Sequence, residues 1–162
     1  MPASAKAITK TGSPAAQLAS FIAKFTPEVG ALAKSIRAAM RKRYPTALEL
    51  VYDNYNALAI GFAPTEKTSE GIFSIAVFPS RVNLFFLQAK GLPDPGKILQ
   101  GSGSVAKHVV LPSPEKLNDP AVKALMREAV ARASVPFDPG GAHRLIIKSI
   151  SAKQRPRRTV KL

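Results

Sequence analysis

The densest apolar stretch of the chain, Gly71 to Lys90, has the pattern of two β-strands. Residues 72–78 and 82–87 are rich in β-branched and aromatic side chains, and residues 79–81, Pro-Ser-Arg, are typical of a tight turn between strands. Both arms carry apolar residues on both faces, with one polar residue in each arm. A hairpin of this kind must be covered on both sides, or it must offer one side to a ligand or partner.

Two stretches before this hairpin and one after it repeat apolar residues at helical spacing. Each begins with an N-cap residue followed by proline, at Ser13-Pro14, Thr26-Pro27 and Asp119-Pro120. The second stretch is expected to end near Arg43, because Tyr44 precedes a proline and cations favour a helix C-terminus. The sequence therefore predicts three helices, two before the sheet and one after it.

From Ala47 the apolar period changes to two, which indicates further strands. Residues 48–53 and 58–62 predict a first hairpin, and residues 106–111 predict a fifth strand after the glycine-rich loop GSGS at 101–104. This order predicts an α+β fold, a two-layer sandwich in which an antiparallel sheet of about five strands has the N-terminal and C-terminal helices packed on one face. No segment of the sequence is an obvious cover for the other face.

One folded domain is expected at residues 14–134, with a segment on either side. Residues 1–13 are small, polar and basic, and we expect them to form a flexible arm. Residues 135–162 are interpreted as a linker and basic C-terminal tail, in which only residues 145–147 with Ile150 are apolar enough to dock on the domain. No apolar run reaches the roughly 18 residues of a membrane span, and the N-terminus lacks the apolar centre of a secretory signal, so we expect a cytoplasmic protein.

Positive charge is concentrated outside the predicted sheet. The chain carries 24 Lys and Arg against 10 Asp and Glu, a net charge of +14. Residues 1–43 hold eight cations and one acid, residues 44–113 hold five of each, and residues 114–162 hold eleven cations and four acids. This distribution predicts a basic surface around a neutral sheet, which attracts nucleic acid, anionic membranes and acidic proteins alike, or merely keeps the protein soluble.

Three strings, in their order and spacing, resemble the YdhG-like family, a widespread bacterial group of unknown function. They are RYPTALE at Arg43–Glu49, Val51–Asp53 with its turn, and Leu99–Gly103 followed by Lys107–Val109. The resemblance covers about residues 16 to 134 and implies a two-layer sandwich similar to frataxin, one branch of the family being regarded as iron-chaperone-like. Iron binding of that type relies on an acidic helix and sheet edge, whereas the corresponding helix here has Glu28 as its only acid, so the resemblance implies the fold more strongly than the activity.

The predicted ligand site lies on the uncovered sheet face beside the glycine-rich loop. Apolar walls with a few polar groups suit a small molecule, and glycine backbone amides beside cations suit an anion. The loop has neither P-loop nor dinucleotide-binding spacing, so a structural turn is the alternative, and Asp53 could likewise be a turn former rather than a ligand contact. The candidate ligand-binding residues are Tyr52, Asp53, Tyr55, Phe62, Phe85, Gly101, Ser102, Gly103, Lys107 and His108.

Nothing in the sequence points to a catalytic or metal site. Cysteine is absent, the two histidines are 35 positions apart, and no nucleophile or second carboxylate stands beside Asp53. We therefore expect a non-enzymatic binding protein without a cofactor, either monomeric or dimerising through the same open face. The alternative is a nonspecific nucleic-acid-associated protein that contacts phosphates through a basic helix and tail. Its candidate residues are Arg37, Arg41, Lys42, Arg43, Lys153, Arg155, Arg157 and Arg158.

Overall fold

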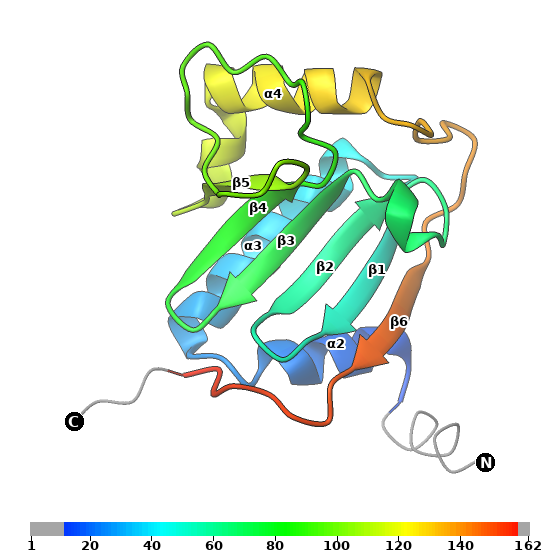
Figure 1. Cartoon of the computed structure of the whole chain (residues 1–162). Helices are drawn as coiled ribbons and strands as arrows, with labels where there is room; N and C mark the ends of the chain where they lie inside the picture. The colour runs from blue at the N-terminus through cyan, green and yellow to red at the C-terminus, as the bar shows by residue number, and fades with distance from the viewer. Residues whose placement is uncertain (1–11, 159–162) are drawn as a thin grey trace.

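A six-stranded sheet forms the centre of the computed structural model, which describes residues 12–158 (Figure 1). The strands are β1 (Leu48–Asp53), β2 (Leu58–Ala63), β3 (Phe73–Phe78), β4 (Arg81–Phe86), β5 (Lys107–Val110) and β6 (Leu145–Ile150). Their order across the sheet is β5-β4-β3-β2-β1-β6. Neighbours from β1 to β5 pair antiparallel, whereas β6 pairs in parallel with β1. The predicted α+β class is confirmed, as is the antiparallel sheet for the first five strands, to which the structure adds the parallel strand β6.

Three α-helices lie on one side of the sheet, and each begins where the sequence predicts. They are α2 (Pro14–Ile22), α3 (Pro27–Arg43) and α4 (Pro120–Ala131). The side chains of Ser13, Thr26 and Asp119 each accept a hydrogen bond from a backbone N–H in the first turn, and a proline follows each cap. In Figure 1, α2 and α3 lie behind the sheet and α4 lies across one of its ends.

The main core lies between the sheet and the helices, because alternate side chains of the strands point to that side. Phe73 contacts two further rings there, the edge of Phe86 at a centroid distance of 5.6 Å and the face of Tyr44 at 5.2 Å. Each such side chain contributes roughly 1.5–3 kcal/mol when fully buried. The largest fully buried core residues include Leu18, Phe25, Ile36, Met40, Ile60, Phe62, Phe73, Ile75 and Phe86.

Strand β6 comes from the segment that the sequence predicts to be a linker and tail, and this differs from the expected five-stranded sheet. Leu145 and Ile147 pack on the main core, and Ile146 packs on the opposite face of the sheet beside Leu50. The chain then continues past the end of β1 to Arg157, which is only 5% exposed. Residues 145–158 therefore belong to the folded domain because both faces of β6 gain apolar neighbours.

The predicted flexible arm and the predicted absence of a membrane span are the remaining expectations about the fold. Most of the predicted flexible arm, residues 1–11, lies outside the described residues. Among residues 12–158, the structure contains no helix with the length and apolar character needed to cross a membrane.

Candidate functional site

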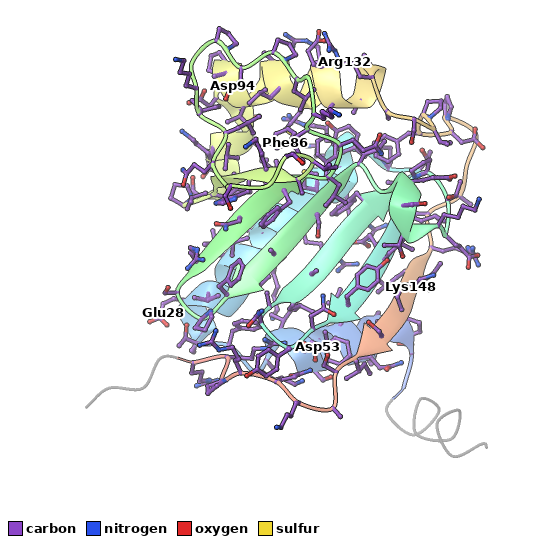
Figure 2. The ribbon with its side chains drawn as sticks, viewed as in Figure 1. Glu28, Asp53, Phe86, Asp94, Arg132 and Lys148 are labelled. Carbon is purple, nitrogen blue, oxygen red and sulfur yellow. The ribbon has the colours of Figure 1, made fainter. Side chains whose placement is uncertain are left out.

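The sheet surface opposite α2 and α3, here called the open face, has no α-helix over it among residues 12–158 and is turned toward the reader in Figures 1 and 2. Its centre is built from small side chains on β2 and β3. Ala59 lies opposite Ala76, and Gly61 lies opposite Ser74. Because none of these side chains rises far from the backbone, the middle of the open face is low.

Larger side chains border this low strip and turn it into a groove. A hollow of about 240 Å³ lies between Tyr52 on β1 and Leu87 after β4. A second hollow, of about 590 Å³, shares Ala59, Ser74 and Leu87 with the first. It is bordered by Tyr55, Phe78 and Phe85. We call the two together the open-face groove, and it runs along β2 and β3.

The walls of the groove are held in place by contacts among the residues that line it. A 2.6 Å hydrogen bond joins the Tyr52 hydroxyl to Oγ1 of Thr68, at the start of the short 3-10 helix η1 (Thr68–Glu70). On the other wall, a Cβ at Gly71 would lie 2.9 Å from Cδ1 of Leu87, so glycine at that position leaves room for Leu87. The phenol and the leucine therefore face each other across the groove from fixed positions.

Beyond Phe78 the groove meets a basic hollow of about 530 Å³ at the turns that end the two hairpins. Arg81 and Arg155 both line it, together with Asn56 and Phe78, which also line the groove. The Arg81 guanidinium lies 4.4 Å from the centre of the Phe78 ring. The groove thus has an apolar middle and two guanidinium groups at one end.

Of the predicted ligand-binding aromatic residues, Tyr52, Tyr55 and Phe85 line the groove and Phe62 does not. The placement of Phe62 on the uncovered face is wrong, because it is 0% exposed and packs in the main core with Leu58 and Ile60. Groove residues that the sequence analysis missed are Ala59, Gly61, Ser74, Ala76 and Leu87. The signal that could have found them is the alternation of small residues on two paired strands.

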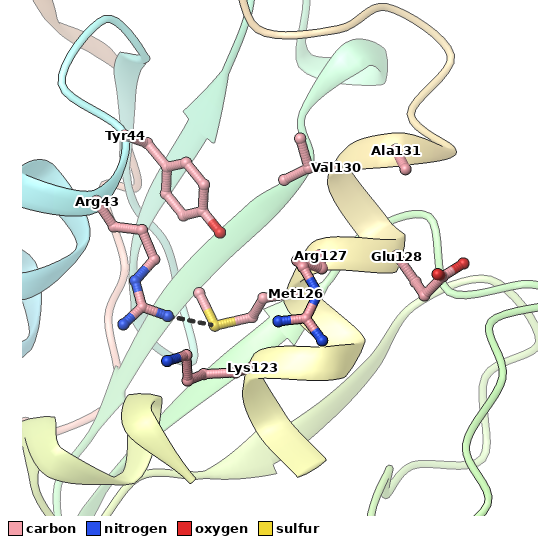
Figure 3. Close-up of a pocket in the computed structure, with 8 residues that line it drawn as sticks. All are labelled: Arg43, Tyr44, Lys123, Met126, Arg127, Glu128, Val130 and Ala131. Atoms are coloured by element: carbon pink, nitrogen blue, oxygen red, sulfur yellow. Dashed lines mark hydrogen bonds between the residues drawn. The ribbon is translucent and has the colours of Figure 1, made fainter. Parts of the chain in front are cut away.

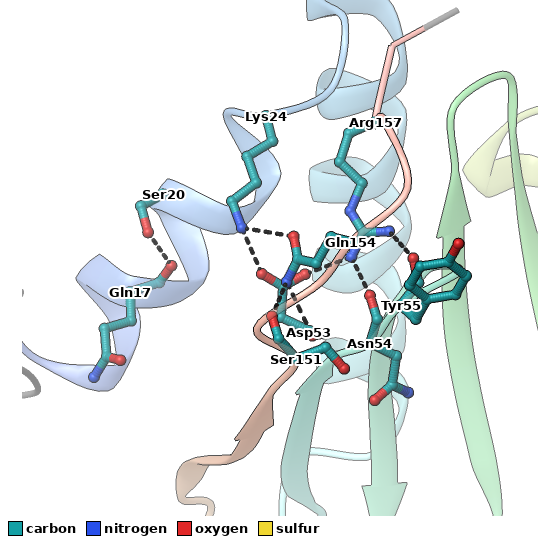
Figure 4. A network of polar contacts seen from close by, with 9 residues as sticks. All are labelled: Gln17, Ser20, Lys24, Asp53, Asn54, Tyr55, Ser151, Gln154 and Arg157. Carbon is teal, nitrogen blue, oxygen red and sulfur yellow. Dashed lines mark hydrogen bonds and ion pairs between the residues drawn. The ribbon is translucent and has the colours of Figure 1, made fainter. Parts of the chain in front are cut away.

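Asp53 lies on the helix side of β1, away from the groove, at the centre of a polar network (Figure 4). Its carboxylate accepts a 2.7 Å hydrogen bond from Nζ of Lys24 and a 2.8 Å hydrogen bond from Nη2 of Arg157. Burial raises the pKa of Asp53, but hydrogen bonds from Lys24, Gln154 and Arg157 together outweigh it and leave this pKa below its usual value. Asp53 is therefore a buried, ion-paired residue rather than a groove contact.

The glycine-rich loop lies beside β5 at the edge of the open face. Gly101 has φ +114°, which favours glycine, and Nζ of Lys107 donates a 2.9 Å hydrogen bond to its carbonyl oxygen. The His108 ring lies tilted against Phe85 at a centroid distance of 4.9 Å, and burial together with nearby Arg81 lowers the pKa of His108. Ser102 and Gly103 are exposed. Lys107 thus bonds to a carbonyl of the loop, a contact that supports its turn.

Arg37 and Arg41, predicted to contact nucleic acid, instead neutralise a second buried carboxylate. Glu49 is 0% exposed and receives two hydrogen bonds from Arg37, at 2.7 and 2.8 Å. Nε of Arg41 lies 3.7 Å from the same carboxylate, and Nε2 of His143 lies 2.8 Å from it. The expectation that these arginines form an outward basic face is therefore wrong for Arg37 and only partly met by Arg41.

Four more of the predicted basic residues contact the chain itself. Arg43 donates to the backbone oxygen of Leu117 and to Oδ1 of Asn118, and Arg155 donates to Oδ1 of Asn56. Arg157 is buried at Asp53, and Arg158 donates to the backbone oxygens of Ala23 and Lys24 just after α2. Lys42 and Lys153 are exposed. The predicted free basic tail is thus largely a set of intramolecular contacts.

Comparison of the chain with protein-family models, with curated proteins and with solved structures finds no match. Within residues 12–158, no three His, Asp or Glu side chains lie close enough together to hold a metal ion.

Proposed function

We propose that this protein binds an elongated apolar small molecule with a carboxylate head, using the open-face groove. The observation that carries the proposal is the strip of small side chains along β2 and β3, bordered by Tyr52 on one side and by Phe85 and Leu87 on the other. A flat apolar surface would favour another sheet, whereas a groove between aromatic walls favours a narrow ligand.

The chemistry of the lining sets the ligand class. The residues of the two groove hollows include no charged side chain, and small apolar and aromatic residues stand among a few polar ones, so the body of the ligand is uncharged and mainly apolar. A six-residue strand is roughly 20 Å long, which suits an extended chain. Arg81 and Arg155 at the end of the groove offer guanidinium forks, which pair well with a carboxylate.

The test is calorimetric titration with decanoate and with decan-1-ol, below the concentrations at which either aggregates. The expected result is that decanoate binds and that Ala59→Leu, which places a larger side chain in both hollows, weakens binding by about tenfold, or about 1.4 kcal/mol. Ala38→Leu, at an exposed position on α3, is the matched control and should leave binding unchanged. Arg81→Gln should weaken decanoate binding and leave decan-1-ol binding as it is.

Two results would overturn the proposal. Decanoate binding that Ala59→Leu does not weaken would place the ligand elsewhere. A dimer in sedimentation experiments that Ala59→Leu dissociates would make a second copy of the chain, not a small molecule, the occupant of the groove.

The resemblance to the YdhG-like family remains part of this proposal. It is supported by the element order of two helices, antiparallel strands and a further helix. The iron-chaperone activity implied for one branch of that family is disfavoured, since Glu49 and Asp53 are buried and ion-paired and Glu28 is the only acid of α3.

A further inference from the structure

A separate hollow of about 700 Å³ lies between the C-terminal end of α3 and the side of α4 (Figure 3). It shares no lining residue with the open-face groove. We call it the α3–α4 cleft, and its volume lies within the range of small-molecule sites. The residues that line it are Arg43, Tyr44, Lys123, Met126, Arg127, Glu128, Val130 and Ala131.

Three cations from two helices surround this cleft. Lys123 and Arg127 are four residues apart on α4, so their side chains project from the same face of the helix. Both are exposed, and within residues 12–158 neither forms an ion pair. Glu128, the one acid among the lining residues, is paired with Arg132 at 2.9 Å. The cleft therefore carries positive charge that its own acid does not cancel.

Arg43 is held in a fixed position at the edge of the cleft. It donates to the backbone oxygen of Leu117 at 3.2 Å and to Oδ1 of Asn118 at 2.9 Å, and its Nη1 lies 3.8 Å from the sulfur of Met126. Its charge thus adds to the positive electrostatic potential of the cleft. Because the side chain is already fixed, a ligand would not have to order it on binding.

Tyr44 supplies a neutral hydroxyl beside an apolar surface. Its ring lies between Phe73 and Phe137, with centroid distances of 5.2 Å to each, and its hydroxyl points into the cleft (Figure 3). Burial raises the pKa of Tyr44 to about 12, against the opposing effect of Arg43, so the hydroxyl keeps its proton at neutral pH. Val130, which is partly exposed, provides apolar surface next to it.

We propose that the α3–α4 cleft binds phosphate monoesters that carry an aromatic group, with Lys123 and Arg127 at the phosphate and Tyr44 and Val130 against the ring. A phosphate monoester carries a charge of about −1.5 to −2 at pH 7, which matches two adjacent cations better than a single carboxylate does. Arginine binds phosphate oxygens through its planar fork, and lysine adds a compact charge. This site is independent of the open-face groove.

The test is titration with phenyl phosphate, inorganic phosphate and phenol, followed by backbone amide NMR shifts at low salt. Phenyl phosphate is expected to bind at least about fivefold more tightly than either fragment, because only the ester uses both the cations and the apolar surface. The double variant Lys123→Gln/Arg127→Gln is expected to weaken phenyl phosphate binding by about tenfold. The thermal unfolding transition of the double variant is the check that the fold is kept.

The matched control is Lys34→Gln/Lys90→Gln, which removes the same net charge from exposed positions outside the cleft. If this control weakens phenyl phosphate binding as much, attraction by net charge alone explains the data and the proposal fails. Equal affinity for inorganic phosphate and phenyl phosphate would also overturn it. So would an affinity for single-stranded DNA that rises with oligonucleotide length and exceeds that for phenyl phosphate, because the cleft would then be part of a nucleic-acid surface. Decanoate binding should be the same in the double variant, which separates this test from that of the groove.

Discussion

The two faces of the sheet differ in the exposure of their aromatic rings and in the location of their charged side chains. On the helix side, Phe62 and Phe86 are 0% exposed, whereas Phe85 on the open face is partly exposed. The helix side also holds the two buried carboxylates of β1, Glu49 and Asp53, while the groove on the open face is lined without a charged residue. Charges are buried where cations from the helices and the C-terminal segment converge on them. The open face is partly buried, at Leu48, Leu50 and Ala63, and stays accessible along the groove.

The largest expected effect is the difference in stability lost when a phenylalanine is truncated on the helix side or on the open face. Phe62→Ala should lower the free energy of unfolding by about 3–5 kcal/mol, because it leaves a cavity in the main core. Phe85→Ala should lower it by no more than about 1.5 kcal/mol, because the ring is already partly in water. Urea unfolding of the two variants measures both values. Similar losses would mean that the open face is packed as tightly as the helix side.

The next effect compares the two buried carboxylates. Asp53→Asn should cost about 3 kcal/mol, because the Arg157 side chain, 3% exposed, loses its counter-charge and cannot reach water. Glu49→Gln should cost less, since the side chains of Arg37 and Arg41 are 24% and 44% exposed and can be hydrated. Urea unfolding at pH 7 ranks the two variants. A larger loss for Glu49→Gln would contradict the idea that access of the cations to water sets the cost.

A third prediction concerns the stability of the protein at low pH. Because the pKa of Asp53 is lower in the folded protein than in the unfolded chain, its ionised form stabilises the fold above the unfolded pKa of about 3.9. This stabilisation is lost as the pH falls through the lowered folded value. The difference in unfolding free energy between the native protein and Asp53→Asn should therefore be constant from pH 7 to 5 and shrink below about pH 4. A difference that persists at low pH would show that packing rather than charge is lost in the variant.

The smallest effect lies at the edge of the open face. Burial and Arg81 lower the pKa of His108, so the folded state favours the neutral ring and loses stability as the pH falls below the unfolded value of about 6.5. His108→Gln should remove that decline, a change of less than about 0.5 kcal/mol. Unfolding measured between pH 7.5 and 5.5 tests this. Identical pH profiles for both proteins would exclude His108 as the source.

The helix starts and the first five strands could be predicted because their signals are local. An N-cap residue followed by proline, or a run of alternating apolar residues, needs no distant partner to be recognised. The face of a strand is a different matter. The period of two places Leu58, Ile60 and Phe62 together, but it does not say which side the helices will cover. The prediction that Phe62 lies on the uncovered face is wrong for this reason.

The polar contacts could not be predicted for the opposite reason, because their partners are far apart in the chain. Arg37 lies 12 residues from Glu49, and Arg157 lies 104 residues from Asp53. The sequence predicts a tail where β6 forms, because that segment follows a proline- and glycine-rich stretch. Its partner strand gives no local signal, since Leu145 pairs with Glu49, 96 residues earlier. A basic segment of this composition looks the same whether it meets phosphates or the protein's own carboxylates.

The position of Arg157 also has a consequence for biosynthesis. A ribosome adds roughly 5–20 residues per second, so Arg157 is made about 5–20 s after Asp53, 104 residues earlier. During that interval the nascent chain can pair Asp53 with Lys24 but not with Arg157, and β1 has no neighbour on the side that β6 will take. The native sheet is therefore completed only after nearly all of the described chain has left the exit tunnel.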